Sequence, residues 1–249
     1  TATTGDNKTA VGDQALSLTT TASDNTAVGR SALKANTTGA TNASVGACSL
    51  RDNTTGSSNV AVGSESLRLN TTAGSNTAVG GRSLFSSTTG ECNVAIGNNA
   101  MKRTTTGHSN TAVGTLALCA NTTGTVNQAF GRVSLCANTT GDCNSAFGYY
   151  TLQANTTGEC NTAIGNSSLA ANTTASGNVA VGAYALLKNT TGTKNSAFGN
   201  YALYSNTTAN DNNAFGYNAL GLNTTGASNV AMGRNALLNN TTGGSNTGV

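Results

Sequence analysis

The stretch "NTAVGRSALKANTTGAT", residues 25–41, is followed at once by "NASVGACSLRDNTTGSS", residues 42–58. A glycine recurs at one phase of this pattern every 17 residues, from Gly12 to Gly233, with no insertion or deletion. Fourteen full units run from Lys8 to Ser245. Numbered from its first Asn, the unit is N-T-A-V-G-x-x-A-L-x-x-N-T-T-G-x-x. A strict period of this kind predicts a repeat architecture.

The repeats keep some positions and vary others. Position 9 is Leu in thirteen units and Met101 in the other, position 3 is Ala apart from Ser44 and Gly248, and position 4 is always apolar. Positions 6, 7, 10, 11, 16 and 17 vary freely, and 20 of the 21 charged side chains lie there, Lys8 being the exception. This contrast predicts that the six variable positions face solvent and that the others build the scaffold.

The repeat length and composition predict the fold class. Seventeen residues are too few for a helical-hairpin repeat, and Asn, Thr and Gly are poor helix formers. The segments "TAV" and "AL" are short, compatible with β-structure, and bounded by residues that readily form turns. We therefore expect an all-β chain, a parallel β-solenoid (β-helix or β-roll) with one coil per repeat, about 14.6 coils (249/17) in all. Residues 1–249 are expected to form a single solenoid domain, a segment of a longer array.

The apolar positions suggest a thin core. Position 4 and Leu at position 9 are expected to form its stripe, supported by hydrogen bonds between coils and by stacked Asn and Thr side chains. In a strand, positions 3 and 4 point to opposite faces, so Ala at position 3 would then point outward. Two explanations of its near invariance stay open: the Ala ladder packs against another copy, three chains being the natural number, or a bend turns both positions inward.

Composition and charge exclude several partner classes. Charged residues make up 8% of the chain and the formal net charge is +3, which gives no basis for binding nucleic acid. No apolar run approaches the roughly 20 residues that cross a bilayer, so we expect no membrane insertion. No Cys/His cluster suggests a metal, and no cofactor motif is present.

The phrases "NVAIGNNAM" (93–101), "NTAVGTLAL" (110–118) and "NVAVGAYAL" (178–186) resemble the head repeats of trimeric autotransporter adhesins. The fuller phrase "NTAIGNSSLAANTTA" is similar to repeat arrays in tail-fibre-like proteins of phages and bacteria. The resemblance covers the whole chain and implies a β-solenoid fibre segment that trimerises. The unit here has 17 residues where the adhesin heads have about 14, the added part being "NTTG".

Eleven Asn residues at position 12 precede Thr-Thr, which makes each a formal acceptor for N-linked glycan. They are Asn36, Asn53, Asn70, Asn121, Asn138, Asn155, Asn172, Asn189, Asn206, Asn223 and Asn240. The alternative is a turn in which each Asn caps backbone donors and stacks as an amide ladder. Both interpretations stay open, and a glycan would help to keep a chain with so few charges in solution.

Two cysteine pairs share a phase in neighbouring coils. Cys119 and Cys136 are 17 residues apart, and so are Cys143 and Cys160. Stacked Cα atoms about 4.8 Å apart fall within the disulfide range, so two bridges between coils are predicted, with six tolerated surface thiols as the alternative. Disulfides would favour an extracellular setting.

Catalysis finds no support in the sequence. The single histidine, His108, lies at variable position 16, and the acidic residues do not recur in a paired phase. We therefore expect a non-enzymatic, extracellular or surface-located fibre or shaft segment that self-associates as a homotrimer or filament, with a coat of covalent glycans if the Asn at position 12 are glycan acceptors. The alternative is an adhesin or tail-fibre module that recognises cell-surface glycans, because the surface tyrosines could stack on sugars.

Overall fold

A computed structural model describes residues 5–249, and within them it contains fifteen short β-strands and no helix. All pairings between neighbouring strands are parallel, which confirms the predicted all-β solenoid with one coil per 17-residue repeat. The strands are β1 (Thr9–Val11), β2 (Thr26–Val28), β3 (Ala43–Val45), β4 (Val60–Val62), β5 (Thr77–Val79), β6 (Val94–Ile96), β7 (Thr111–Val113), β8 (Gln128–Phe130), β9 (Ser145–Phe147), β10 (Thr162–Ile164), β11 (Val179–Val181), β12 (Ser196–Phe198), β13 (Asn213–Phe215), β14 (Val230–Met232) and β15 (Thr247–Gly248).

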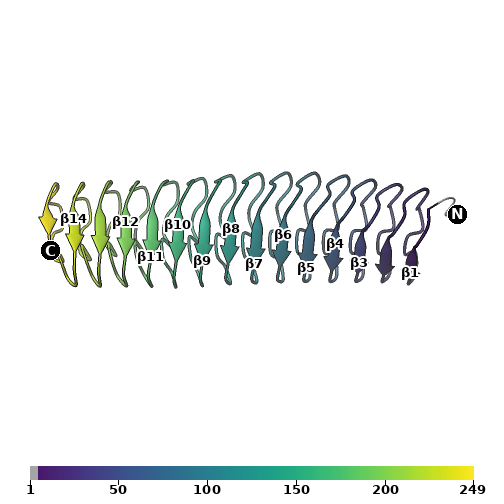
Figure 1. The fold of residues 1–249 in the computed structure, drawn as a ribbon, viewed down its shortest axis with the longest axis horizontal. Coiled ribbons are helices and arrows are strands. Elements are labelled where there is room, and N and C mark those ends of the chain that lie inside the picture. The colour runs from purple at the N-terminus through teal and green to yellow at the C-terminus, as the bar shows by residue number, and fades with distance from the viewer. Residues whose placement is uncertain (1–4) are drawn as a thin grey trace. The chain divides into compact units, whose positions relative to one another are not determined.

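The chain forms two compact units of the same construction. The first ends at Val126 and contains β1–β7, and the second begins at Asn127 and contains β8–β15. Within each unit, every strand pairs with the strand one repeat later, and equal positions are partners, as Ala27 is with Ser44. Figure 1 shows this succession of coils in each unit. The prediction of one domain over residues 1–249 stays a prediction.

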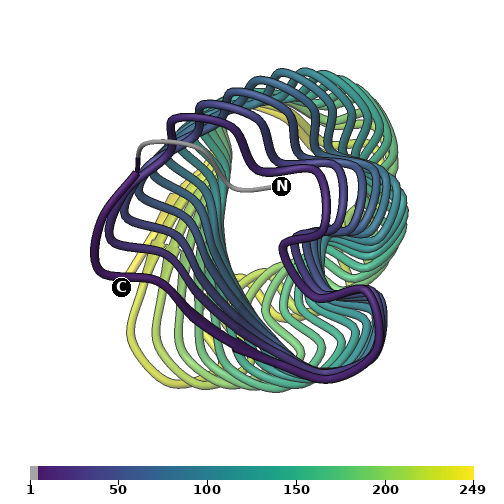
Figure 2. The same cartoon turned by 90° about the vertical axis from the view of Figure 1, so that its right-hand side faces the viewer.

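Each coil is a strand followed by a series of tight bends. Positions 2–4 form the strand, Gly at position 5 ends it, and turns carry the chain through positions 6–11. Non-glycine residues at positions 7, 9 and 17 have a left-handed backbone, with φ values of 57°, 48° and 57° at Ser31, Leu33 and Thr41. Successive coils of one unit consequently follow almost the same outline when seen end-on (Figure 2).

The core does not lie where the side-chain sizes suggested. The residues at position 9 are fully buried from Leu33 to Leu220, as predicted, and each contributes roughly 1.5–3 kcal/mol. The Ala at position 3, such as Ala27, is also 0% exposed, together with the small residue at position 8. The apolar residue at position 4 points outward, so the expected core role of position 4 and the outward direction of Ala at position 3 are both wrong. A single large side chain per coil fills the narrow interior, and the strand must turn its smallest residue inward.

Position 5 requires glycine because neighbouring coils approach each other closely there. Gly46 has φ of 135°, and a Cβ built on it would lie 2.5 Å from the carbonyl oxygen of Gly63 in the next coil. The same contact recurs along both units, for example between Gly182 and Gly199. A side chain at this position would push neighbouring coils apart, which explains why the repeats keep glycine.

Two ladders of buried Asn run through the coils. The ladder at position 12 is the one that the amide-ladder interpretation describes, and the ladder at position 1 was not predicted. At position 1, the backbone N–H of Asn59 donates to Oδ1 of Asn42 (2.9 Å), and Nδ2 of Asn59 donates to the carbonyl of Ala73 (2.9 Å). At position 12, Nδ2 of Asn53 donates to Oδ1 of Asn36 (2.8 Å) and to the carbonyl of Gly56 (2.9 Å). These side chains satisfy buried backbone groups and join each coil to the next.

The variable positions face outward, as predicted. Positions 6, 7, 10, 11, 16 and 17 are exposed or half-buried within the described residues, apart from Ser31, Val133 and Gly221. The charged side chains at these positions therefore lie on the outside of the coils, whereas Lys8, at position 1, buries its Nζ atom.

Candidate interaction surfaces

The outer sheet face consists of the side chains at positions 2 and 4 of the strands. It carries no charged residue on any of the fifteen strands, although no packed layer covers it within its own unit. Its position 4 is Val, Ile, Phe or Met from Val11 to Met232, and several of these residues are widely exposed: Val62 exposes 37% of its surface and Met232 exposes 51%. The sequence contained the signal for this surface, namely an always-apolar position beside a nearly invariant Ala, but the assumption that larger residues point inward hid it.

Aromatic rings reinforce the outer sheet face in the second unit. Phe130 stacks on Phe147 with ring centroids 4.9 Å apart, and Phe198 stacks on Phe215 at 5.0 Å. We call each apolar side chain at position 4 a rung of the outer sheet face. A rung that exposes about two fifths of its surface would contribute roughly 0.6–1.2 kcal/mol of free energy if a partner covered it. A continuous apolar surface of this kind is typical of an interaction site.

The first unit has a groove formed by the residues that come directly after the strand in each coil. Its volume is about 430 Å³, and its walls come from positions 6, 7, 10 and 11 of three successive coils: Gln14, Leu18, Arg30, Ser31, Lys34, Ala35, Cys48, Arg51 and Asp52. Arg51 is neutralised by Asp52 through two contacts, Nε to Oδ1 at 2.7 Å and Nη2 to Oδ2 at 2.8 Å. Arg30 and Lys34 form no ion pair within residues 5–249, so the groove has an excess of positive charge.

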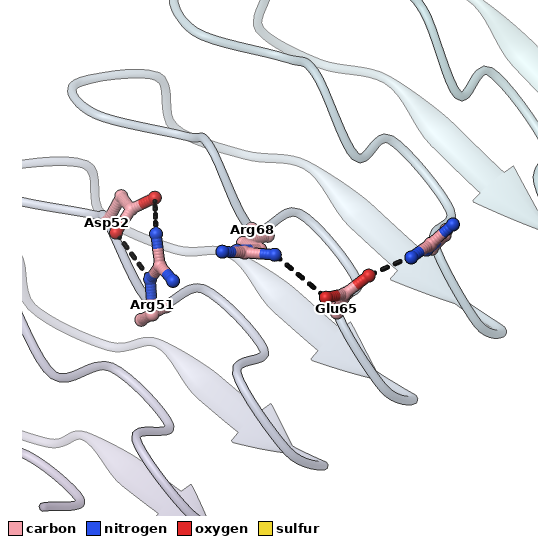
Figure 3. A network of polar contacts seen from close by, with 5 residues as sticks. Arg51, Asp52, Glu65 and Arg68 are labelled. Carbon is pink, nitrogen blue, oxygen red and sulfur yellow. Dashed lines mark hydrogen bonds and ion pairs between the residues drawn. The ribbon is translucent and has the colours of Figure 1, made fainter.

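The same side continues as a row of charged side chains along the coils (Figure 3). Glu65 accepts a hydrogen bond from Arg68 of its own coil at 2.8 Å and from Arg82 of the next coil at 2.6 Å. The hydrogen bond from Arg82 holds the pKa of the Glu65 carboxyl below its ordinary value, and Arg68 adds to the effect. Because Glu65 binds two cations, this row stays positive overall.

Tyrosines gather on the corresponding side of the second unit. Tyr184 stacks on Tyr201 with ring centroids 5.2 Å apart, and Tyr201 also contacts Tyr204 and Tyr217. The Nζ atom of Lys188 lies 5.0 Å from the centre of the Tyr204 ring. Such a cluster presents flat apolar surface and positive charge together, a combination suited to stacking on a sugar ring.

The candidate glycosylation sites lie inside the coils. The Asn at position 12 are fully buried from Asn36 to Asn223, and Asn240 in the last coils is half-buried. The Nδ2 atom of Asn155, for example, donates to Oδ1 of Asn138 and to the carbonyl of Gly158. Glycosylation stays a prediction, and a glycan on Nδ2 would require the folded coil to give up these hydrogen bonds.

The predicted disulfide partners fall into two cases. Cys143 and Cys160 stack in neighbouring coils of the second unit as unbridged thiols. Burial raises the pKa of the Cys143 thiol, and the neighbouring Cys160 thiol raises it further. Cys119 belongs to the first unit and Cys136 to the second. Both bridges stay predictions.

The single histidine lies on the surface of the first unit. His108 is exposed, and its Nδ1 contacts only the hydroxyl of Ser109 at 3.4 Å. Among the described residues, no three His, Cys, Asp or Glu side chains are grouped so that they could hold a metal ion. The described residues also contain no helix with the length and apolar character needed to span a membrane.

Comparison with protein-family models, with curated proteins and with solved structures finds no match for this chain.

Proposed function

We propose that the chain is a non-catalytic structural segment, a fibre or shaft element located outside the cell or on the surface of a cell or virion. The observation that carries this proposal is the bonding of coil to coil within each unit. Each repeat places its strand and its glycine in register with those of the next repeat in the same unit, and most repeats do the same with two Asn. Adding a repeat lengthens such a stack without changing its cross-section, which is the property that a shaft requires.

Self-association belongs to the same proposal, through a different surface from the one the sequence suggested. The Ala ladder at position 3 is 0% exposed in β2 and in β4–β14, so it offers nothing to a partner. The outer sheet face offers apolar side chains at every coil instead. Copies that cover each other's outer sheet face would remove this surface from water, which supports assembly into a multi-chain fibre.

Electron microscopy of the purified protein tests the shaft. We expect thin, unbranched particles whose length grows in proportion to the number of repeats when whole 17-residue units are added. A variant with four added repeats, copied from residues 178–245, is the matched comparison. Particles whose length does not change with the number of repeats would contradict the proposal.

A glycan-binding module is the second candidate, and the tyrosine cluster of the second unit favours it. Tyr184, Tyr201 and Tyr217 hold their rings together on an outward-facing side. A glycan array tests this candidate, with Tyr184→Ser/Tyr201→Ser as the comparison variant. Selective glycan binding by the unmodified chain, lost in this variant, would support a receptor-binding role in addition to the shaft role.

A further inference from the structure

The charges of the chain are segregated to the two sides of the outer sheet face. We call positions 16 and 17, which precede each strand, the leading edge, and positions 6, 7, 10 and 11, which follow it, the trailing edge. The leading edge is acidic in both units, with Asp6, Asp24 and Glu91 in the first and Asp142, Glu159 and Asp211, against the one cation Lys194, in the second. Ten of the chain's twelve Lys and Arg lie on the trailing edge instead.

The trailing edge has a positive excess in both units. In the first unit its cations are Arg30, Lys34, Arg51, Arg68, Arg82, Lys102 and Arg103, against Asp13, Asp52 and Glu65. In the second unit they are Arg132, Lys188 and Arg234, and this part of the trailing edge has no acidic residue. Each unit therefore presents, in the direction of its strands, an acidic edge, an uncharged apolar face and a basic edge.

We propose that the outer sheet face binds a second copy of this chain, face to face, in a two-fold pair whose coils stack in the same direction. This inference rests on the self-association in the proposed function and adds the identity, number and orientation of the partner. A two-fold axis along the direction of coil stacking makes the strands of the two copies run oppositely. The acidic leading edge of each copy then faces the basic trailing edge of the other.

The opposite orientation is disfavoured by the same charges. A two-fold axis along the strands would reverse the stacking direction of the second copy and leave its strands running the same way as the first. Leading edge would then meet leading edge, placing Asp142 and Glu159 near the acidic residues of the partner. Like charges in opposition weaken an interface and suppress that arrangement, whereas opposite charges select the parallel pair.

The spacing of the apolar rungs points to a second copy as the partner. The outer sheet face presents one large apolar side chain per coil, and neighbouring coils are separated by the distance between paired strands, about 4.8 Å. A partner covers every rung only if its own apolar side chains repeat at that distance. This chain has that repeat, including the stacked pairs Phe130–Phe147 and Phe198–Phe215.

Sedimentation equilibrium of the purified chain tests the pairing. We expect a dimer at low salt whose dissociation constant rises with ionic strength, because the edges are solvent-exposed. The variant Asp142→Lys/Glu159→Lys/Asp211→Lys, with both edges basic in the second unit, should dimerise about tenfold more weakly or worse. Six lysines at exposed position 14 change the net charge by the same amount, are the matched control and should weaken the dimer less: Thr140→Lys, Thr157→Lys, Thr174→Lys, Thr191→Lys, Thr208→Lys and Thr225→Lys.

Mixing variants separates a charge effect from misfolding. The variant Arg132→Glu/Lys188→Glu/Arg234→Glu has both edges acidic in the second unit and should also dimerise weakly alone. Mixed with the Asp142→Lys/Glu159→Lys/Asp211→Lys variant, it should form mixed dimers at least as tightly as the unmodified chain forms its own. Failure of the mixture to pair, with both variants giving unchanged circular dichroism spectra, would overturn the proposal.

Cross-linking tests the orientation. In a background with the six native Cys replaced by Ser, Val28→Cys places a thiol on the outer sheet face near one end of the first unit. A parallel pair brings the two residue-28 thiols together, and oxidation should give a covalent dimer. A dimer that does not cross-link there, or a trimer in sedimentation, would overturn the two-fold parallel pair. A monomer that still forms length-proportional particles would overturn the pair and leave the shaft standing.

Discussion

The Asn ladder at position 12 is continuous in the second unit and interrupted in the first. From Asn138 to Asn240 every repeat has Asn, and from Asn155 onward each Nδ2 donates to Oδ1 of the preceding repeat at 2.9–3.2 Å. In the first unit, Thr19, Ser87 and Thr104 stand in place of Asn. The buried Thr19 Oγ1, Asn70 Oδ1 and Thr104 Oγ1 have no hydrogen-bond partner there, whereas none of the buried atoms recorded without a partner lies in residues 127–249.

This difference shows that a substitution in one repeat removes a hydrogen bond from the neighbouring repeat. Asn70 keeps its own bond from Nδ2 to Oδ1 of Asn53 at 2.7 Å. Its Oδ1 lacks a partner because the next repeat has Ser87, whose side chain is too short to reach back. A buried acceptor without a donor costs about 1–3 kcal/mol. The repeats are thus coupled through their side chains as well as through their strands.

The largest effect should come from a position that both units share. Gly46→Ala in the first unit and Gly182→Ala in the second would each place a Cβ about 2.5 Å from the next coil's backbone, at a φ that favours glycine. We expect each to lower the free energy of unfolding by roughly 2–5 kcal/mol, equally in the two units, in urea denaturation. Thr174→Ala, at an exposed position 14, is the control. A tolerated substitution in only one unit would show that the coils do not stack alike.

Breaking the continuous ladder should have the next largest effect. Asn189→Ser removes the donor to Oδ1 of Asn172 (3.1 Å) and the acceptor that Asn206 uses (2.9 Å). It copies the interruption found at Ser87 into the second unit. We expect a loss of about 1–3 kcal/mol, with faster amide hydrogen exchange in the coil of Asn172. An unchanged unfolding midpoint would mean that the ladder adds nothing to stability.

Repairing the interrupted ladder should give a gain of smaller size. Ser87→Asn/Thr104→Asn would supply a donor to Oδ1 of Asn70 and remove the unpartnered Thr104 hydroxyl. We expect the free energy of unfolding to rise by about 1–2 kcal/mol, from two hydrogen bonds of ordinary strength. Ser86→Asn, at half-buried variable position 11, controls for the added amide. A loss of stability would show that the first unit has adapted to its shorter side chains.

The smallest effect should come from backbone strain at position 17. Val126 in the first unit and Gly177 in the second both have a left-handed backbone, with φ of 58° and 71°. A β-branched residue is strained there, and Asn is not. We expect Val126→Asn to raise the free energy of unfolding by roughly 0.5–1 kcal/mol, and Gly177→Val to lower it. Thermal unfolding of the two variants would check the opposite signs.

Much of the fold could be predicted from the sequence because the repeats are many and have no insertions. The 17-residue period, the buried Leu at position 9, the outward-facing variable positions and the amide ladder all follow from comparing repeats such as residues 25–41 and 42–58. The apolar outer sheet face was assigned to the wrong side of the strand, because Ala at position 3 and Val at position 4 gave a correct alternation with the wrong phase. Invariance of the small residue was the better signal of burial.

The sequence by itself determined that equal positions stack on one another, since no other arrangement lets a strict period bond each repeat to the next. Only the tertiary structure decided which side of the strand faces inward. The reason is volume: tight bends at positions 5, 7, 9 and 17 close each coil around one Leu, two Asn and small residues. Val, Ile and Phe at position 4 find no room there, and their exposure is what makes the outer sheet face available to a partner.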